Sequence, residues 1–465
     1  MKKGAIRIVV VSMIILGIML SGCEQERQFH ESIDAKEINT YKERNSDGGT
    51  EQSAKETPSP NSADAVEKVE LEMAILVTGH GPMEQFAQNF SIQSSEVKVN
   101  VTKISDEAGK ARVIADIMSG KGPDVLLTSQ EDAMRLYSDG ALSCISEYLS
   151  DDVKNAVLPG IVEYGTSNGE LVGLPPCVKS IRTFIARKDV LKSSECTLDR
   201  LLELRKTNGN VRRIFSYQNE SMDVYMEFYG LIGADLRRSK YLDWDKGISA
   251  FAKNGFDEIL KLLKQESEIK IGGADSVRNG EVLAYYYPMS DPLLLYYALA
   301  ELGDLGNVIG FPTQQGGESF FAVDGLLVIN QKSERDKEIE EFLEYVFSLS
   351  NQTSDVNFFS IRSDVAEYAL DEKNDGKNSS DVKCVWRYGK WNKKDNAVAI
   401  PLSGSKEELT IAYESFMQSL ISDQTEEEVI NVIWEETDAY LGGGKSAEET
   451  VKSIDRRVQL YFDER

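Results

Sequence analysis

The chain has 465 residues and a formal net charge of −25 at pH 7. This length exceeds what one hydrophobic core usually serves, so we expect two or more lobes. Hydrophobic residues make up 41% of the sequence, a share typical of globular rather than disordered proteins. So acidic a chain repels phosphate backbones, which excludes nucleic acid as an expected partner.

The first residues have the parts of an export signal. A basic start with Lys2, Lys3 and Arg7 precedes an apolar stretch of 13 residues, from 8 to 20. A helix of that length spans about 20 Å, short of a hydrocarbon core of about 30 Å. Residues 1–22 are therefore predicted to be a cleaved signal peptide and not a membrane span.

The signal ends in Leu-Ser-Gly followed by Cys23, and this ending resembles the lipobox of bacterial lipoproteins. The resemblance implies lipidation of Cys23. It also implies a protein anchored through that lipid to the extracellular or periplasmic face of the cell membrane. Residues 23–66 are polar with isolated apolar residues, so they are predicted to be a disordered tether. A flexible segment of that length reaches about 35–40 Å.

Cysteine and histidine are too sparse or too scattered for common metal and redox motifs. No two cysteines form a C-x-x-C pair, which argues against a zinc ribbon or a thioredoxin-like site. The tether and the folded region hold one histidine each, His30 and His80. We therefore expect no metal and no cofactor. Beyond Cys23, zero to two disulfides remain possible among Cys144, Cys177, Cys196 and Cys384.

Predicted strands and helices alternate from residue 69 onward. Strands are predicted at 70–77, 97–104 and 125–127, with helices at 83–90 and 108–118. Such alternation predicts a parallel sheet that is covered on both faces. Near the end of the chain, two apolar stripes at helical spacing predict two packed helices, separated by three glycines at 442–444. Trp434 lies on one of these stripes and is expected to be a core residue.

Three short motifs resemble catalytic or ion-binding signatures. Residues 165–169 fit G-x-S-x-G, but both histidines precede Ser167, and Asn168-Gly169 between apolar runs predicts a hairpin turn. Gly444-Lys445-Ser446 lacks the earlier glycine of a P-loop. Residues 371–376 depart from a calcium loop at a ligand position and are predicted to be a solvated loop.

A series of segments resembles, in order, extracellular solute-binding proteins of the sugar type, the maltose-binding-protein-like class. These segments are MSGKGPDV (118–125), YSDGAL (137–142), NGELVGLP (168–175), IARKDVL (185–191), GE (280–281), GFP (310–312), FSIRSD (359–364) and the tail at 433–464. The resemblance implies an α/β fold of the periplasmic-binding-protein-like type II, with two lobes, hinge crossovers and C-terminal helices.

The resemblance also implies where the lobes divide. Lobe one would comprise 66–177 and 314–358, and lobe two 180–310 and 362–465. The chain would cross between lobes near 175–181, 309–313 and 359–362. Pro175-Pro176 and Phe311-Pro312 are stiff, extended segments, as expected for such crossings.

The implied function is capture of a small solute, by family default a carbohydrate, and its delivery to the permease subunits of an ABC importer. The protein would act as a monomer and would not be an enzyme. Two alternatives remain open. One is a lipid-anchored sensor or adhesin with the same fold, and the other is a tethered secreted hydrolase.

Ligands of open α/β sheets bind at the carboxyl ends of the strands. That rule and the resemblance together give a set of candidate ligand-binding residues: His80, Thr128, Glu131, Lys179, Tyr217, Tyr286, Met289 and Trp386. Tyr285, Tyr286 and Tyr287 alternate along one strand, so at least one of them is expected to be core. Aromatic faces commonly pack on sugar rings, and positions 128 and 289 carry none.

Overall fold

The computed structural model describes residues 68–79, 81–216, 223–232, 239–290, 292–303, 306–354, 358–366, 385–388, 397–400, 406–422 and 427–464. The predicted signal peptide, Cys23, the tether, Cys384 and the loop at 371–376 lie outside these residues. Residues 66–465 form one compact unit. Within the described part of the chain, no helix is long and apolar enough to cross a membrane, and Cys144 and Cys196 are free thiols.

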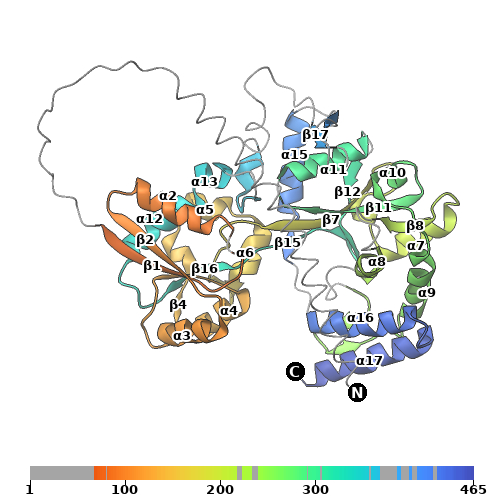
Figure 1. Cartoon of the computed structure of the whole chain (residues 1–465), viewed down its shortest axis with the longest axis horizontal. Coiled ribbons are helices and arrows are strands. Elements are labelled where there is room, and N and C mark those ends of the chain that lie inside the picture. Colours follow the sequence, from red (N-terminus) through yellow and green to blue (C-terminus); the bar gives the residue numbers. More distant parts are fainter. Residues whose placement is uncertain are drawn as a thin grey trace, which may run out of the picture. The chain divides into compact units, whose positions relative to one another are not determined.

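The first sheet has five strands in the order β2-β1-β3-β16-β4 (Figure 1). Its strands are β1 (Val69–Ile75), β2 (Val97–Lys103), β3 (Val125–Thr128), β4 (Leu142–Ser143) and β16 (Leu326–Asn330). Strand β1 pairs in parallel with β2 and β3, whereas β16 runs antiparallel to β3 and β4. The predicted strands and their parallel pairing are confirmed, and the return strand β16 comes from about 200 residues further along the chain.

Helices cover both faces of this sheet, as its apolar strands require. Helices α2 (Met83–Gln93) and α12 (Asp336–Phe347) pack on one face, where the Phe90 and Phe342 rings lie 5.3 Å apart. Helices α3 (Glu107–Met118) and α4 (Gln130–Ser138) pack on the other. The Ser129 side chain caps α4 by accepting from the backbone N–H of Asp132. This cap fixes where the helix begins, directly after β3.

The second sheet has the strand order β19-β15-β7-β11-β8, and β12 also pairs with β7. Its strands are β7 (Ser180–Arg187), β8 (Arg213–Ser216), β11 (Val282–Met289), β12 (Gly306–Val308), β15 (Phe320–Ala322) and β19 (Ile421–Ser422). Strand β7 is antiparallel to β11, β12 and β15, and β11 is parallel to β8. This sheet is therefore mixed, whereas all strands of the first sheet except β16 run in one direction.

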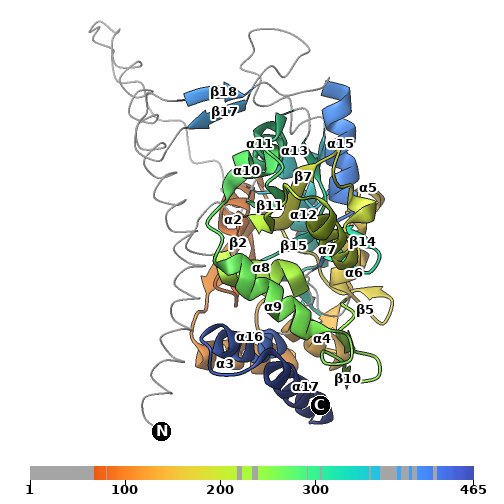
Figure 2. The ribbon, with the colours of Figure 1, turned by 90° about the vertical axis from the view of Figure 1, so that its right-hand side faces the viewer.

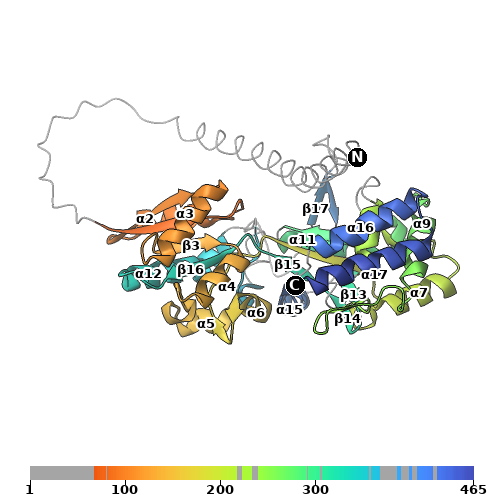
Figure 3. The same cartoon turned by 90° about the horizontal axis from the view of Figure 1, so that it is seen from below.

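Helices again surround the second sheet. They are α7 (Leu198–Thr207), α8 (Asp223–Ile232), α9 (Phe256–Ser267), α10 (Gly273–Arg278), α11 (Pro292–Glu301) and α15 (Lys406–Gln418). The last two helices, α16 (Glu427–Leu441) and α17 (Ala447–Asp463), lie side by side (Figure 3), and α17 also lies against α9 (Figure 2). The predicted helix pair is confirmed. The Trp434 ring lies 5.1 Å from that of Phe228 and packs, partly buried, against the core as the apolar stripe predicts.

Shorter elements complete the chain. They are helices α5 (Asp151–Ala156), α6 (Pro159–Gly165) and α13 (Leu349–Ser354), 3-10 turns at Ile145–Tyr148, Ser193–Glu195 and Ser363–Val365, and the hairpins β5 (Thr166–Ser167) with β6 (Glu170–Leu171), β9 (Leu242–Asp243) with β10 (Ile248–Ser249), β13 (Phe311–Thr313) with β14 (Gly316–Glu318), and β17 (Val385–Tyr388) with β18 (Ala397–Ile400). Asn168 and Gly169 both have positive φ, 51° and 85°, in the β5–β6 turn. The predicted hairpin at the G-x-S-x-G sequence is therefore confirmed.

The return to the first sheet comes later than the sequence predicts. The expected crossing at 309–313 instead contains the first strand of the β13–β14 hairpin. Strand β15 follows and still pairs with β7 of the second sheet, so the chain crosses at 323–325. Residues 314–322 were therefore wrongly assigned to the first lobe, because an extended Phe-Pro segment suits a hairpin strand as well as a crossing.

Candidate functional site

The carboxyl ends of the parallel strands lie at one edge of each sheet. In the first sheet, β1, β2 and β3 end at the edge where β16 begins, since Thr128 pairs with Leu326. In the second sheet, β11 and β15 end where β7 begins, since Met289 pairs with Ile181 and Ala322 with Ser180. Strand β8 runs parallel to β11 but ends at Ser216, level with Tyr285 and Ile185 and short of this edge. Loops that follow these strands are where open α/β sheets bind ligands.

These two edges adjoin each other through the connecting segments. The last residue of β15, Ala322, and the first of β16, Leu326, are separated by the three residues 323–325. A connection of three residues spans only about 10 Å. We call residues 175–181 the first connection, 323–325 the second and 359–362 the third. The first connection runs alongside the second, because the backbone N–H of Lys179 donates to Ala322 O at 2.9 Å. The carboxyl-end edges of both sheets therefore meet at the same connections.

Two strands end in a buried hydroxyl, one in each sheet. Thr128 ends β3 and Ser216 ends β8, and both residues are fully buried. Neither hydroxyl has a hydrogen-bond partner among the described residues. A buried polar atom without a partner costs about 1–3 kcal/mol. Both hydroxyls could therefore bond a polar group, and Thr128 would do so from the edge where β16 begins.

An ion pair joins the first two connections. Lys179 Nζ donates to Asp324 Oδ1 at 2.6 Å, with side chains that are 48% and 11% exposed. The backbone of Gly79, in the loop after β1, packs directly on this carboxylate. A Cβ on Gly79 would lie only 2.0 Å from Asp324 Oδ1. Asp324 therefore contacts both the loop next to His80 and the predicted ligand residue Lys179.

A second close approach brings Thr128 to the same place. Gly325 follows Asp324, and a Cβ at this position would lie 2.5 Å from Thr128 O. Only glycine lets the connection pass so close to the end of β3. The structure thus gathers Thr128, Lys179 and the loop flanking His80 around residues 323–325.

The other predicted site residues lie elsewhere or cannot be placed. Glu131 is exposed in the first turn of α4. Met289 is fully buried in the core at the end of β11. Trp386 lies on β17, where it pairs with Ala399, but its side chain is outside the described residues. His80 and Tyr217 also lie outside them, directly before Gly81 and after Ser216.

Tyr286 makes packing contacts. Its ring lies 5.6 Å from that of Phe184 and 6.0 Å from that of Phe311, and burial raises its pKa to about 12. Tyr285 and Tyr287 are buried in the core cluster of the opposite face. The prediction that at least one of the three tyrosines belongs to the core is therefore confirmed.

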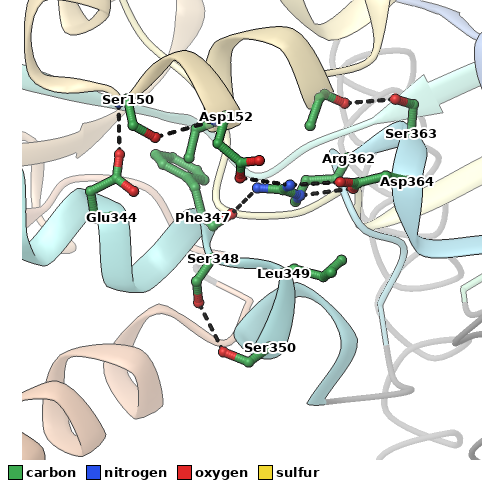
Figure 4. Close-up of polar contacts among 12 residues, drawn as sticks. Ser150, Asp152, Glu344, Phe347, Ser348, Leu349, Ser350, Arg362, Ser363 and Asp364 are labelled. Carbon is green, nitrogen blue, oxygen red and sulfur yellow. Dashed lines mark hydrogen bonds and ion pairs between the residues drawn. The ribbon is translucent and has the colours of Figure 1, made fainter.

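A buried arginine anchors the third connection (Figure 4). Arg362 is 1% exposed and donates to both carboxylate oxygens of Asp364, at 2.8 and 2.7 Å, to Asp152 Oδ2 at 3.0 Å and to Phe347 O at 3.1 Å. Its hydrogen bonds to Asp364 raise the pKa of Arg362 and lower that of Asp364. This network holds the third connection to α5 and to the end of α12.

A buried glutamine ties the third connection to the first. Gln352 Nε2 donates to Pro176 O at 2.9 Å and to Val346 O at 3.1 Å. Its Oε1 accepts from Ser360 Oγ at 2.9 Å and from the Ile361 N–H at 3.2 Å. Val178 and Phe359 also exchange two backbone hydrogen bonds. These hydrogen bonds hold the first and third connections together.

Sequence reasoning missed Asp324, Ser216 and Gln352. Asp324 bonds Lys179, which lies 145 residues away in the chain. Gln352 is buried in a short helix, where it accepts from Ser360. No periodicity links such residues before the fold is known. The only available signal was Asp324-Gly325 ahead of the apolar run of β16, which marks a turn near a strand end.

The chain resembles several solved structures along nearly its whole folded length. One is an extracellular solute-binding protein from Alicyclobacillus acidocaldarius, with TM-score 0.54, 12% identity and coverage of 86% of this chain and 100% of that chain. A second is the sugar-binding protein MalE from Xanthomonas citri, with TM-score 0.52, 15% identity and coverage of 85% and 98%. A third is the cyclic alpha-maltosyl-1,6-maltose binding protein from Arthrobacter globiformis, with TM-score 0.51, 13% identity and coverage of 86% and 100%.

At these identities the likeness shows the fold, which is the predicted periplasmic-binding-protein-like type II. No curated protein matches the sequence significantly. The sequence model of bacterial extracellular solute-binding proteins matches residues 84–380, more than half of the chain. The chain therefore belongs to the family of bacterial extracellular solute-binding proteins.

Proposed function

We propose that this protein captures a small carbohydrate where the carboxyl-end edges of its two sheets adjoin, and delivers it to the permease of an ABC importer. The observation that carries this proposal is the junction at residues 323–325. There the end of β3, the loop after β1 and Lys179 all meet a connection between the sheets. A solute bound there would contact both sheets, and such double contact would favour closure around it.

The polar groups at these edges fit an uncharged polyhydroxyl compound. Thr128 at the junction and Ser216 at the end of β8 have hydroxyls that both donate and accept, and Lys179 adds an ammonium beside a carboxylate. Two of the structurally similar proteins are named for binding sugars, which points in the same direction. Of the predicted aromatic contacts, Trp386 and Tyr217 remain part of the proposal.

We further propose that the mature protein is a monomer tethered through a lipid on Cys23, with residues 23–66 as a spacer. This follows from the lipobox-like ending of the signal segment. The division into a first lobe around β1–β4 and β16 and a second around β7–β15 and β19 is part of the same proposal. The protein would release its ligand unchanged, without catalysis.

A thermal-shift screen of the soluble protein from residue 66 onward tests the proposal. The panel should hold maltose, maltotriose, maltotetraose and monosaccharides, with amino acids and polyamines as competing classes. A ligand at 100 times its Kd stabilises by about 2.7 kcal/mol. With about 2.1 cal/mol/K per residue over about 400 residues, that raises Tm by about 3 °C. A shift only with amino acids or polyamines would contradict the carbohydrate assignment.

Chromatography of the bound ligand gives the matching test for catalysis. After prolonged incubation with the protein, maltotriose should be recovered intact. Formation of shorter sugars would favour the alternative of a tethered hydrolase.

A further inference from the structure

Asp324 lies at the junction of the two sheets, next to residues that are distant in the sequence. It lies on the three-residue connection between β15 and β16, where the two sheets adjoin. Its side chain is only 11% exposed, yet its carboxylate bonds a lysine of another connection at 2.6 Å. A carboxylate so largely removed from water requires such a partner.

The same carboxylate also supports the loop after β1. Because a Cβ on Gly79 would lie 2.0 Å from Oδ1 and 2.8 Å from Oδ2, the loop backbone rests directly on Asp324. The next glycine of this loop, Gly81, approaches the first connection in the same way, with a Cβ position 3.0 Å from Cys177 Sγ. The loop is therefore packed against both connections, with Asp324 as its closest contact.

We propose that Asp324 is a positioning residue of the solute site, which fixes the Lys179 ammonium and the backbone at Gly79 in one arrangement. This rests on the proposed function insofar as Lys179 and the loop at 78–81 touch the solute. Lys179 is half-exposed and has a long flexible side chain, so fixing it in advance removes an entropic cost that binding would otherwise carry. Asp324 acts through these neighbours and does not itself need to contact the ligand.

The contact between Asp324 and Lys179 can be tested without any ligand, by measuring how fast individual lysines are acetylated. A carboxylate oxygen 2.6 Å away accepts a hydrogen bond from the Lys179 side chain and holds it in place, so its nitrogen is less available to an acylating reagent. Acetylation by an N-hydroxysuccinimide ester, followed by peptide mass spectrometry, reports the rate at each lysine. In Asp324→Asn, the rate at Lys179 should rise about threefold or more while that at Lys98 stays unchanged.

The chain offers matched controls. Lys98 pairs with Glu70 at 3.1 Å on the exposed surface, near the start of β1. Glu70→Gln removes the same charge as Asp324→Asn, and should alter only Lys98. Gly79→Ala should raise the Lys179 rate as Asp324→Asn does, because its methyl group displaces the carboxylate. Gly209→Ala, which meets nothing within 4 Å, should not. An unchanged Lys179 rate in Asp324→Asn, or equal increases at both lysines, overturns the proposal.

Affinities measured for the two single variants and the double variant of Asp324 and Lys179 separate positioning of the lysine from a purely structural role of Asp324. Titration calorimetry with maltotriose should show about a tenfold loss of affinity in Asp324→Asn. In the Lys179→Met background, the same substitution should cost clearly less affinity, because only the support of the Gly79 backbone remains to be lost. Equal losses in both backgrounds contradict positioning through Lys179. If the wild type does not bind maltotriose, the cycle is run with the sugar that raises Tm most; if no sugar of the panel binds, the proposed ligand class fails, and the lysine rates still decide the role of Asp324.

Discussion

Replacement of Gln352 by leucine should destabilise the protein strongly, although the residue lies in a short helix and carries no charge. Gln352 is 3% exposed, and its amide makes four hydrogen bonds, to Pro176 O, Val346 O, Ser360 Oγ and the Ile361 N–H. Leucine has a similar size but leaves all four groups without this partner. Each unsatisfied buried group costs about 1–3 kcal/mol. We take the lower bound, about 4 kcal/mol in all, because the connections can relax.

Thermal unfolding followed by circular dichroism measures this effect. Unfolding entropy of about 2.1 cal/mol/K per residue over about 400 residues converts 4 kcal/mol into a fall in Tm of about 5 °C. The matched control is Gln93→Leu, since Gln93 is exposed and makes one long hydrogen bond of 3.5 Å. It should shift Tm by less than about 1 °C. If Gln352→Leu melts within 1 °C of the wild type, the clamp between the first and third connections is refuted.

Three further predictions concern other parts of the chain. Arg362 lowers the pKa of Asp364 below its usual value of 3.8, so this pair stabilises the fold above pH 3.8 and the stabilisation is lost as pH falls further. In urea titrations, the difference in free energy of unfolding between wild type and Asp364→Asn should be constant from pH 7 to about 4 and should shrink below pH 4. Gly169→Val places a side chain at a residue with φ 85°, so it should lower the free energy of unfolding in urea by about 1–2 kcal/mol. An unchanged urea midpoint would contradict the assigned turn. Cys23→Ala should move the protein from the membrane fraction to the medium, and its retention in membranes would argue against a lipid anchor.

Local patterns predicted the first half of the fold well. The strands β1, β2 and β3 and the helices between them follow from hydrophobic periodicity alone, since each buries a regular face. The turn at Asn168-Gly169 and the glycine break between α16 and α17 follow from local backbone chemistry. These features depend on residues close together in sequence.

The site depends on residues far apart, and there the prediction was only partial. The strand-end rule pointed to Thr128 and the family resemblance to Lys179, and both residues lie at the junction. It also favoured Met289, which the structure buries in the core, because the rule does not distinguish the two faces of a strand end. The second crossing was misplaced since Phe311-Pro312 lies in a hairpin strand, and only the pairing of β15 with β7 reveals this.

Hydrogen–deuterium exchange of the soluble protein, with and without maltotriose or the sugar that raises Tm most, tests the central claim directly. We predict that ligand slows exchange in segments 76–81, 128–131, 176–180 and 323–325, which lie at the adjoining strand ends. Segments at the opposite edge of the first sheet, such as 68–70 and 95–97, should be unaffected. Protection confined to that opposite edge, or to the helix pair α16–α17, would contradict a site at the junction of the two sheets.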